Sequence, residues 1–158
     1  MARTVDLTVI DDSGVTGWLR GATRIGEIAA SGFSDMVQQV RDTVGYGEEP
    51  LIHRLDVLTH GSSQHIRLGG DSLSIDTFSI YAPYLGMLQG WFEEEGFVLF
   101  SACNIGQNRV LMLALAKALK TTVYAGTGKS YSTIGYWNTG EYAYAMPQGW
   151  YQVGVPRP

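Results

Sequence analysis

Hydrophobic and polar residues alternate along the chain in two kinds of segment. Segments of strand length, either alternating and β-branched or apolar throughout, predict β-strands at residues 4–10, 53–59, 97–102 and 121–125. Segments in which apolar residues recur every three or four positions predict helices at residues 34–44, 82–92 and 109–120. Because strands and helices alternate, we expect an α/β fold with a mostly parallel central sheet flanked by helices.

Residues that favour helix ends refine this expectation. Ser34 and Asn108 are expected to cap the first and third helices. Pro83 is expected in the first turn of the middle helix, where a missing N–H is tolerated, and Glu93–Glu95 would form its solvated end. Residues 13–32 have no sustained period and are expected to form a loop with a short hairpin.

Two small β units complete the predicted fold. Gly69-Gly70 predicts a β-hairpin formed by residues 66–75, just after the second strand. A Tyr-rich tail around the turn at 138–140 predicts β-structure near the C-terminus. No repeat or linker divides the sequence, so residues 1–158 are expected to form a single domain.

Two of the predicted strands end in a reactive residue. The strand at 53–59 is followed by His60 and Gly61, and the strand at 97–102 by Cys103, the only cysteine of the chain. The carboxyl ends of parallel strands share one edge of a sheet, where open α/β folds place their ligand sites. We therefore expect the histidine and the thiol to lie close together as a nucleophilic dyad.

In such a dyad Cys103 is the nucleophile and His60 the base that takes the thiol proton. The dipole of the helix starting near Asn108 would favour the thiolate, and the backbone N–H groups of Gly61 and Cys103 are candidates for stabilising an oxyanion. Gly106 is expected to ease the turn into that helix. The alternative is a cysteine that is buried as a small hydrophobic residue, with a structural histidine.

Residues at the neighbouring strand ends are candidates for a substrate pocket. An aspartate pointing inward after the first strand would favour a basic substrate residue before the scissile bond, and a lysine pointing inward after the fourth strand would favour an acidic one there. For the aspartates, an exposed turn is the alternative. The pocket candidates are Asp11, Asp12, Ser101, Gly126, Thr127 and Lys129.

Three other patterns resemble functional motifs, but each lacks a residue that its function would need. Gly70-Asp-Ser72-Leu is similar to a serine-esterase motif, but no histidine follows His65 in the chain to serve that serine. Residues 126–130 are similar to a phosphate loop, but position 123 is valine where that motif needs glycine. His60 and His65 have no second cysteine beside them, so no metal site is expected.

Charge narrows the classes of partner. The net charge of −4 and the lack of a Lys/Arg cluster go against a nucleic-acid partner. The charged N-terminus is unlike a signal peptide, and the longest apolar helix is far shorter than the roughly 20 residues that span a bilayer. A lone cysteine gives no internal disulfide. We expect a soluble, cytoplasmic domain without a membrane partner, either alone or within a larger protein.

The segments Thr59-His60-Gly61-Ser62 and Phe100-Ser-Ala-Cys103-Asn-Ile-Gly106 resemble the His-Gly and Ala-Cys signatures of the caspase-like cysteine peptidases of clan CD. The likeness, over roughly residues 55–128, is to bacterial caspase-like domains of large surface proteins and tetratricopeptide-linked effectors. It implies a three-layer α/β fold, peptide hydrolysis by His60 and Cys103, a protein or peptide substrate, and no cofactor. Caspases carry glycine two residues after the nucleophile, whereas here it follows three residues on. The arginines that make caspases prefer aspartate have no clear counterpart here, so that preference is not carried over.

A catalytically silent caspase-like module that binds proteins is the alternative to a cysteine endopeptidase. The presence of both His60 and Cys103 favours the enzyme, and the lack of obvious pocket charges favours the module. An esterase acting through Ser72 is a weaker third possibility. Nothing in the sequence determines the oligomeric state.

Overall fold

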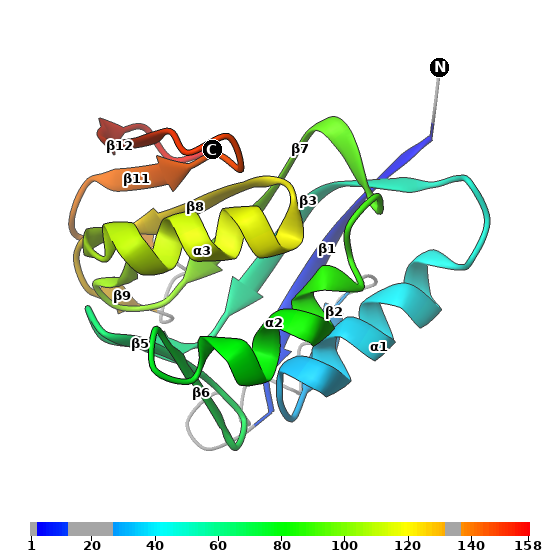
Figure 1. Ribbon diagram of the computed structural model, residues 1–158, viewed down its shortest axis with the longest axis horizontal. Coiled ribbons are helices and arrows are strands. Elements are labelled where there is room, and N and C mark those ends of the chain that lie inside the picture. Colours follow the sequence, from blue (N-terminus) through cyan, green and yellow to red (C-terminus); the bar gives the residue numbers. More distant parts are fainter. Residues whose placement is uncertain (1–2, 13–26, 132–136) are drawn as a thin grey trace.

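The fold is built on a seven-stranded sheet, as the computed structural model shows for residues 3–12, 27–131 and 137–158 (Figure 1). The strand order is β12-β11-β8-β7-β3-β1-β2. Five strands are parallel, and the last two in the sequence are antiparallel to their neighbours. The strands are β1 (Thr4–Asp11), β2 (Glu27–Ala30), β3 (Leu51–Leu58), β7 (Phe92–Ser101), β8 (Thr122–Gly126), β11 (Tyr142–Ala145) and β12 (Tyr151–Val155).

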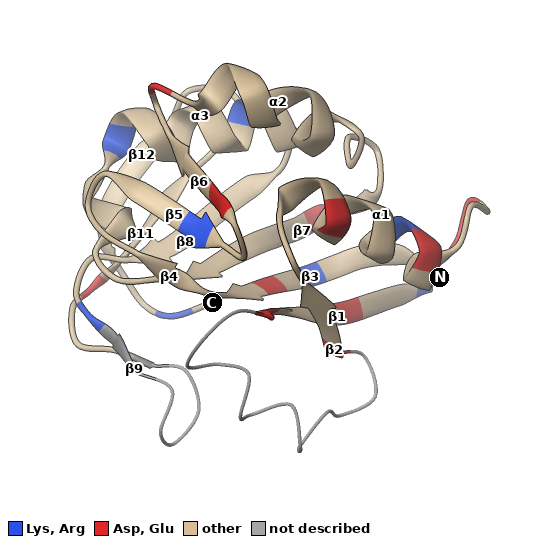
Figure 2. Cartoon of the chain, turned by 90° about the horizontal axis from the view of Figure 1, so that it is seen from below, with Lys and Arg blue, Asp and Glu red and all other residues tan. Residues whose placement is uncertain are grey.

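Three helices pack side by side on one face of this sheet: α1 (Phe33–Val44), α2 (Phe78–Gly86) and α3 (Arg109–Leu119) (Figures 1 and 2). Between sheet and helices lies a core of fully buried apolar side chains, because the strands place alternate residues on that face. The predicted α/β class, with a mostly parallel central sheet flanked by helices, is confirmed.

The start of α1 differs from the prediction. Gly32 is the N-cap residue and Ser34 lies inside the helix, so the predicted serine cap is wrong. The free N–H of Phe33 instead donates to Asp71 Oδ2 at 2.9 Å, a carboxylate supplied from 38 positions away in the sequence. Just before it, β2 pairs with β1 where a loop was expected. The rest of that predicted loop, residues 13–26, lies outside the described residues.

The middle helix also differs from its prediction. It begins at Phe78, four residues before the expected start, so Pro83 lies in the helix interior and not in the first turn. Phe78 and Leu85 pack into the core, and the Tyr81 ring lies 5.2 Å from that of Phe33 on α1. Burial of these apolar side chains outweighs the unfavourable position of the proline. The predicted helix end at 93–95 is part of strand β7.

Two small antiparallel sheets carry the loops around the carboxyl edge. One is formed by β4 (His60–Gly61), β5 (His65–Leu68) and β6 (Asp71–Ser74), and the other by β9 (Ser130–Tyr131) and β10 (Trp137–Asn138). The hairpin after the histidine strand and the β-structure near the C-terminus were both predicted. Both are confirmed.

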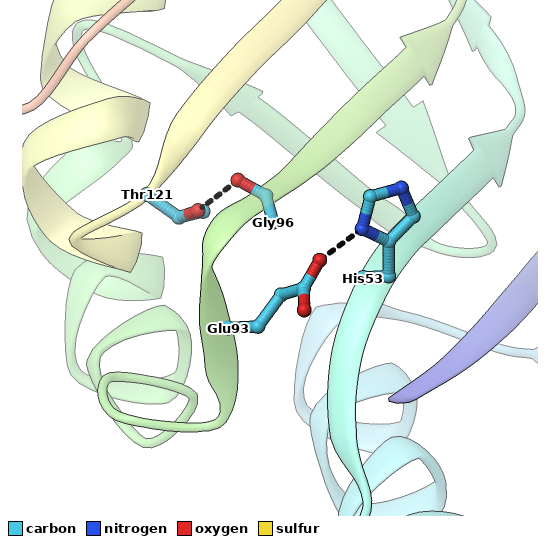
Figure 3. A network of polar contacts seen from close by, with 4 residues as sticks. All are labelled: His53, Glu93, Gly96 and Thr121. Atoms are coloured by element: carbon cyan, nitrogen blue, oxygen red, sulfur yellow. Dashed lines mark hydrogen bonds and ion pairs between the residues drawn. The ribbon is translucent and has the colours of Figure 1, made fainter. Parts of the chain in front are cut away.

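The opposite end of the sheet is held by polar contacts of its own (Figure 3). His53 Nδ1 on β3 contacts Glu93 Oε1 at the start of β7, and Thr121 Oγ1 donates to the Gly96 carbonyl at 2.8 Å. These contacts join β3, β7 and the residue before β8 across an irregularity in the β3–β7 register. His53 therefore lies at the amino end of the sheet, far along β3 from the histidine at its carboxyl end.

None of the helices in the described parts of the chain is both long and apolar enough to cross a membrane.

Candidate functional site

The register of two parallel strands brings His60 and Cys103 to the same edge of the sheet. Leu58 of β3 pairs with Ser101 of β7, and the Thr59 N–H continues the ladder by donating to the Ser101 carbonyl at 3.1 Å. His60 lies two residues after Leu58, and Cys103 lies two residues after Ser101. Adjacent strands lie about 4.8 Å apart, so the sheet delivers the histidine and the thiol to the same edge.

The two reactive groups differ in exposure. His60 is exposed and Cys103 is half-buried. The imidazole makes no hydrogen bond to any of the described residues. Hydrogen bonds between catalytic groups are often long before a substrate is bound, so the placement of His60 and Cys103 is compatible with a dyad that closes on its substrate.

A sharp turn after β7 presents the cysteine. Asn104 adopts the left-handed conformation, with φ 61°, which asparagine tolerates better than most residues. Its N–H donates to the Gly128 carbonyl at 2.8 Å, which ties the turn to the loop after β8. Gly106 has a different role from the one predicted: a Cβ there would lie 2.6 Å from the Ala125 carbonyl oxygen, so it allows close packing on β8.

The N-terminus of α3 is connected to the hairpin that follows His60. The Asn108 side chain accepts a hydrogen bond from the Leu111 N–H at 3.0 Å, which confirms the predicted cap. Its amide donates to the Ser63 carbonyl at 2.9 Å. One side chain therefore fixes both the helix start after the cysteine loop and the turn after the histidine.

Gly61 lies where the histidine hairpin meets the cysteine loop. A Cβ at this position would lie 2.9 Å from the Ala102 Cβ, 3.0 Å from the His65 carbonyl oxygen and 3.4 Å from that of Cys103. Only glycine fits without displacement of these atoms. The backbone of Gly61 therefore lies against the Cys103 segment.

Asp11 anchors the hairpin to the end of β1. Its side chain is buried, with 1% exposed. Oδ1 accepts from the Gly69 N–H and Oδ2 from the Thr59 hydroxyl, each at 3.1 Å. The same hydroxyl also contacts the Arg67 carbonyl oxygen. Since Thr59 directly precedes His60, the Asp11 carboxylate helps to fix the chain next to the proposed base.

A pocket of about 290 Å³ opens beside the histidine, lined by Asp11, His60, Arg67 and Gly69. Asp11 is the one predicted pocket residue among these four. Arg67 was missed by the sequence analysis. The length of the turn between β4 and β5 is the signal that could have found it, because this length sets His60 opposite Arg67.

The other pocket candidates are placed around the edge. Asp12 donates its N–H to the Ala30 carbonyl at 3.0 Å. Ser101 is buried at the end of β7, with 8% exposed. Gly126 is also buried, and a Cβ on it would lie 2.2 Å from the Asn138 side chain.

The loop that resembles a phosphate-binding motif has its N–H groups engaged. Thr127 donates to the Glu141 carbonyl at 2.8 Å, Gly128 to Asn138 Oδ1 at 2.8 Å and Lys129 to Thr139 Oγ1 at 3.0 Å. A phosphate loop needs such groups free to face its ligand, so these three donors do not form one. The side chain of Lys129 is exposed.

Side chains that bind metals do not gather in the described part of the chain: it contains no group of three or more His, Cys, Asp or Glu residues placed to hold an ion. Ser72 lies in β6, opposite Arg67, and its carbonyl accepts from Thr77 Oγ1 at 2.8 Å.

A comparison with protein families gives a match over most of the chain. Residues 5–141 match the model described as "Domain of unknown function (DUF4347)". The chain belongs to this family. The matched range runs from β1 to the residue before β11 and includes both His60 and Cys103. No curated protein and no solved structure matches the chain.

Proposed function

We propose that this chain is a cysteine endopeptidase of the caspase-like type, in which His60 and Cys103 hydrolyse peptide bonds through a thioester intermediate. The observation that carries the proposal is the β3–β7 register, which sets both residues two positions beyond a paired Leu58 and Ser101. The resemblance of the flanking residues to clan CD signatures supports it.

The reaction follows from the roles of the two side chains. His60 takes the thiol proton, and the Cys103 sulfur bonds to the carbonyl carbon of the substrate. The backbone N–H groups of Gly61 and Cys103 are the proposed donors to the resulting oxyanion. The carbon–nitrogen bond then breaks, and His60 gives its proton to the leaving amine. Water, deprotonated by His60, hydrolyses the thioester and restores the free thiol.

The proposal also covers partner and location. A protein or peptide is the proposed substrate, and the net charge of −4 goes against nucleic acid. A cytoplasmic location is proposed because thiols stay reduced there.

The test is the rate at which iodoacetamide alkylates Cys103, measured against pH in the wild type and in His60→Ala. A working dyad gives fast alkylation already near roughly pH 6, and much slower alkylation in the variant. His53→Ala is the matched control, because that histidine lies at the other end of β3. Peptide cleavage should disappear in Cys103→Ala.

Alkylation that rises only near roughly pH 8.5 and does not depend on His60 would mean an ordinary thiol. A chain with such a thiol and without cleavage would be the silent caspase-like module, and its function would then lie in protein binding. Labelling of Ser72 by a fluorophosphonate, with no labelling of the cysteine, would instead favour the esterase.

A further inference from the structure

The antiparallel hairpin places a basic side chain beside the proposed base. His60 and Arg67 are direct cross-strand partners in β4 and β5. Cross-strand partners point to the same face, with their Cβ atoms about 5 Å apart. The pocket of about 290 Å³ is lined by both residues, so the guanidinium and the imidazole border one space.

Arg67 is available to a ligand, whereas the other charged group of the pocket is engaged. Arg67 is exposed, and its guanidinium forms no ion pair with any described residue. Asp11 is almost fully buried, and each of its oxygens accepts a hydrogen bond, from Thr59 and from Gly69. Arg67 is therefore the exposed charged side chain of the pocket, within reach of a ligand.

The proposed base lines the pocket, which relates the pocket to the leaving group. The base of a cysteine peptidase must reach the nitrogen of the leaving amine in order to protonate it. The substrate residue directly after the scissile bond is attached to that nitrogen. A pocket shared by His60 and Arg67 is therefore within reach of this residue.

We propose that Arg67 selects substrates with an acidic residue directly after the scissile bond. This inference rests on the proposed peptidase function. The guanidinium pairs with the side-chain carboxylate of that residue, in a geometry that favours two parallel hydrogen bonds. Arg67 is thus a specificity residue that acts on binding and acylation. Hydrolysis of the thioester, which follows departure of the leaving peptide, does not involve it.

The first experiment is digestion of a proteome-derived peptide library by the wild type, Arg67→Gln and Lys117→Gln, with the cut sites read by mass spectrometry. Lys117→Gln is the matched control, because it removes the same charge from an exposed position on α3. We expect Asp and Glu to be enriched after the cut about tenfold over Gln in the wild type and the control, which corresponds to a charge-assisted pair of ordinary strength. The enrichment should disappear in Arg67→Gln.

Cuts with no acidic enrichment would overturn this inference and leave the peptidase intact. Enrichment of Lys or Arg after the cut would also overturn it, and would mean that Asp11 controls the pocket. A wild type that makes no Cys103-dependent cuts refutes the peptidase, and with it this role for Arg67.

A second measurement needs no hydrolysis. Iodoacetate and iodoacetamide differ in charge, so the ratio of their rates with Cys103 reports on the local field. We expect the iodoacetate-to-iodoacetamide ratio to fall about threefold in Arg67→Gln relative to Lys117→Gln, since a unit charge about 6 Å from the reagent carboxylate would act with this strength in a water-like medium. Equal ratios in the two variants would place Arg67 outside the reach of a group bound at the cysteine.

Discussion

Removal of the Asp11 carboxylate should loosen the hairpin that carries both His60 and Arg67. In Asp11→Ala the Gly69 N–H loses its acceptor, which costs about 1–3 kcal/mol for a buried donor. The Thr59 hydroxyl loses less, because the Arg67 carbonyl remains as its second acceptor. We therefore expect Asp11→Ala to lower the free energy of unfolding by about 2–3 kcal/mol.

Asp11→Asn should cost only about 1 kcal/mol. The amide oxygen can still accept from Gly69, and the Thr59 hydroxyl can donate to the Arg67 carbonyl while it accepts from the new NH₂ group. Asp6→Ala is the matched control: Asp6 is an exposed carboxylate of the same strand, so its loss should change stability by less than about 0.5 kcal/mol.

The assay is urea denaturation of the three variants. Where the slope of the unfolding free energy against urea concentration is unchanged, the shift of the midpoint reports the change in stability. Hydrogen exchange at the Gly69 amide gives the local readout, and it should accelerate in Asp11→Ala before the bulk of the sheet exchanges. If Asp11→Ala and Asp6→Ala have the same midpoint, the carboxylate does not support the hairpin, and the anchoring of His60 through Thr59 must be abandoned.

Three further predictions concern packing, capping and titration. Gly61→Ala should destabilise the fold by about 1–3 kcal/mol, because the added Cβ would overpack the junction with the cysteine loop. Gly70→Ala is the control and should be near neutral, because a Cβ there meets nothing within 4 Å. Equal urea midpoints for the two variants would refute the crowding at Gly61. Asp71→Ala removes the carboxylate that caps α1 and should lower the free energy of unfolding by about 1–2 kcal/mol, measured by urea denaturation. Asp76→Ala, at an exposed position, should change it little. A loss of similar size in both variants would mean that the cap is not the cause. Burial raises the pKa of Tyr124 above its ordinary value near 10, so the tyrosine ionises at lower pH in the unfolded chain than in the folded one. The stability that the protonated Tyr124 contributes is complete below about pH 10 and is lost as the pH rises through the higher folded pKa. Tyr124→Phe should flatten this decline of stability with pH.

Much of the fold could be predicted from the sequence, since its cause is local. The parallel strands that were predicted are short apolar or alternating runs, and their period and length identify them without a structure. The third helix was predicted with its cap, because Asn108 satisfies a backbone donor three residues away. The ends of strands β3 and β7 likewise put a histidine and a cysteine at one edge of the sheet.

Local signals failed where a distant segment supplies the partner. Ser34 is a good cap by type, but Asp71 from the hairpin already satisfies the helix start. The helix at Phe78 begins early and includes Pro83, because its apolar face packs against α1. Strand β2 was missed since its hydrogen bonds come from β1. In each case the deciding energy is a contact between segments that the sequence alone does not bring together.

The candidate site divides in the same way. The residue types at the strand ends determined which side chains are capable of nucleophilic chemistry, and the sequence was sufficient for that. The tertiary structure decided what surrounds them: it buried Asp11 under two hydrogen bonds, and it set Arg67 across from His60. The residue type determines which chemistry a side chain is capable of, whereas the groups that surround it depend on which segments pack together. That packing exists only in the folded chain.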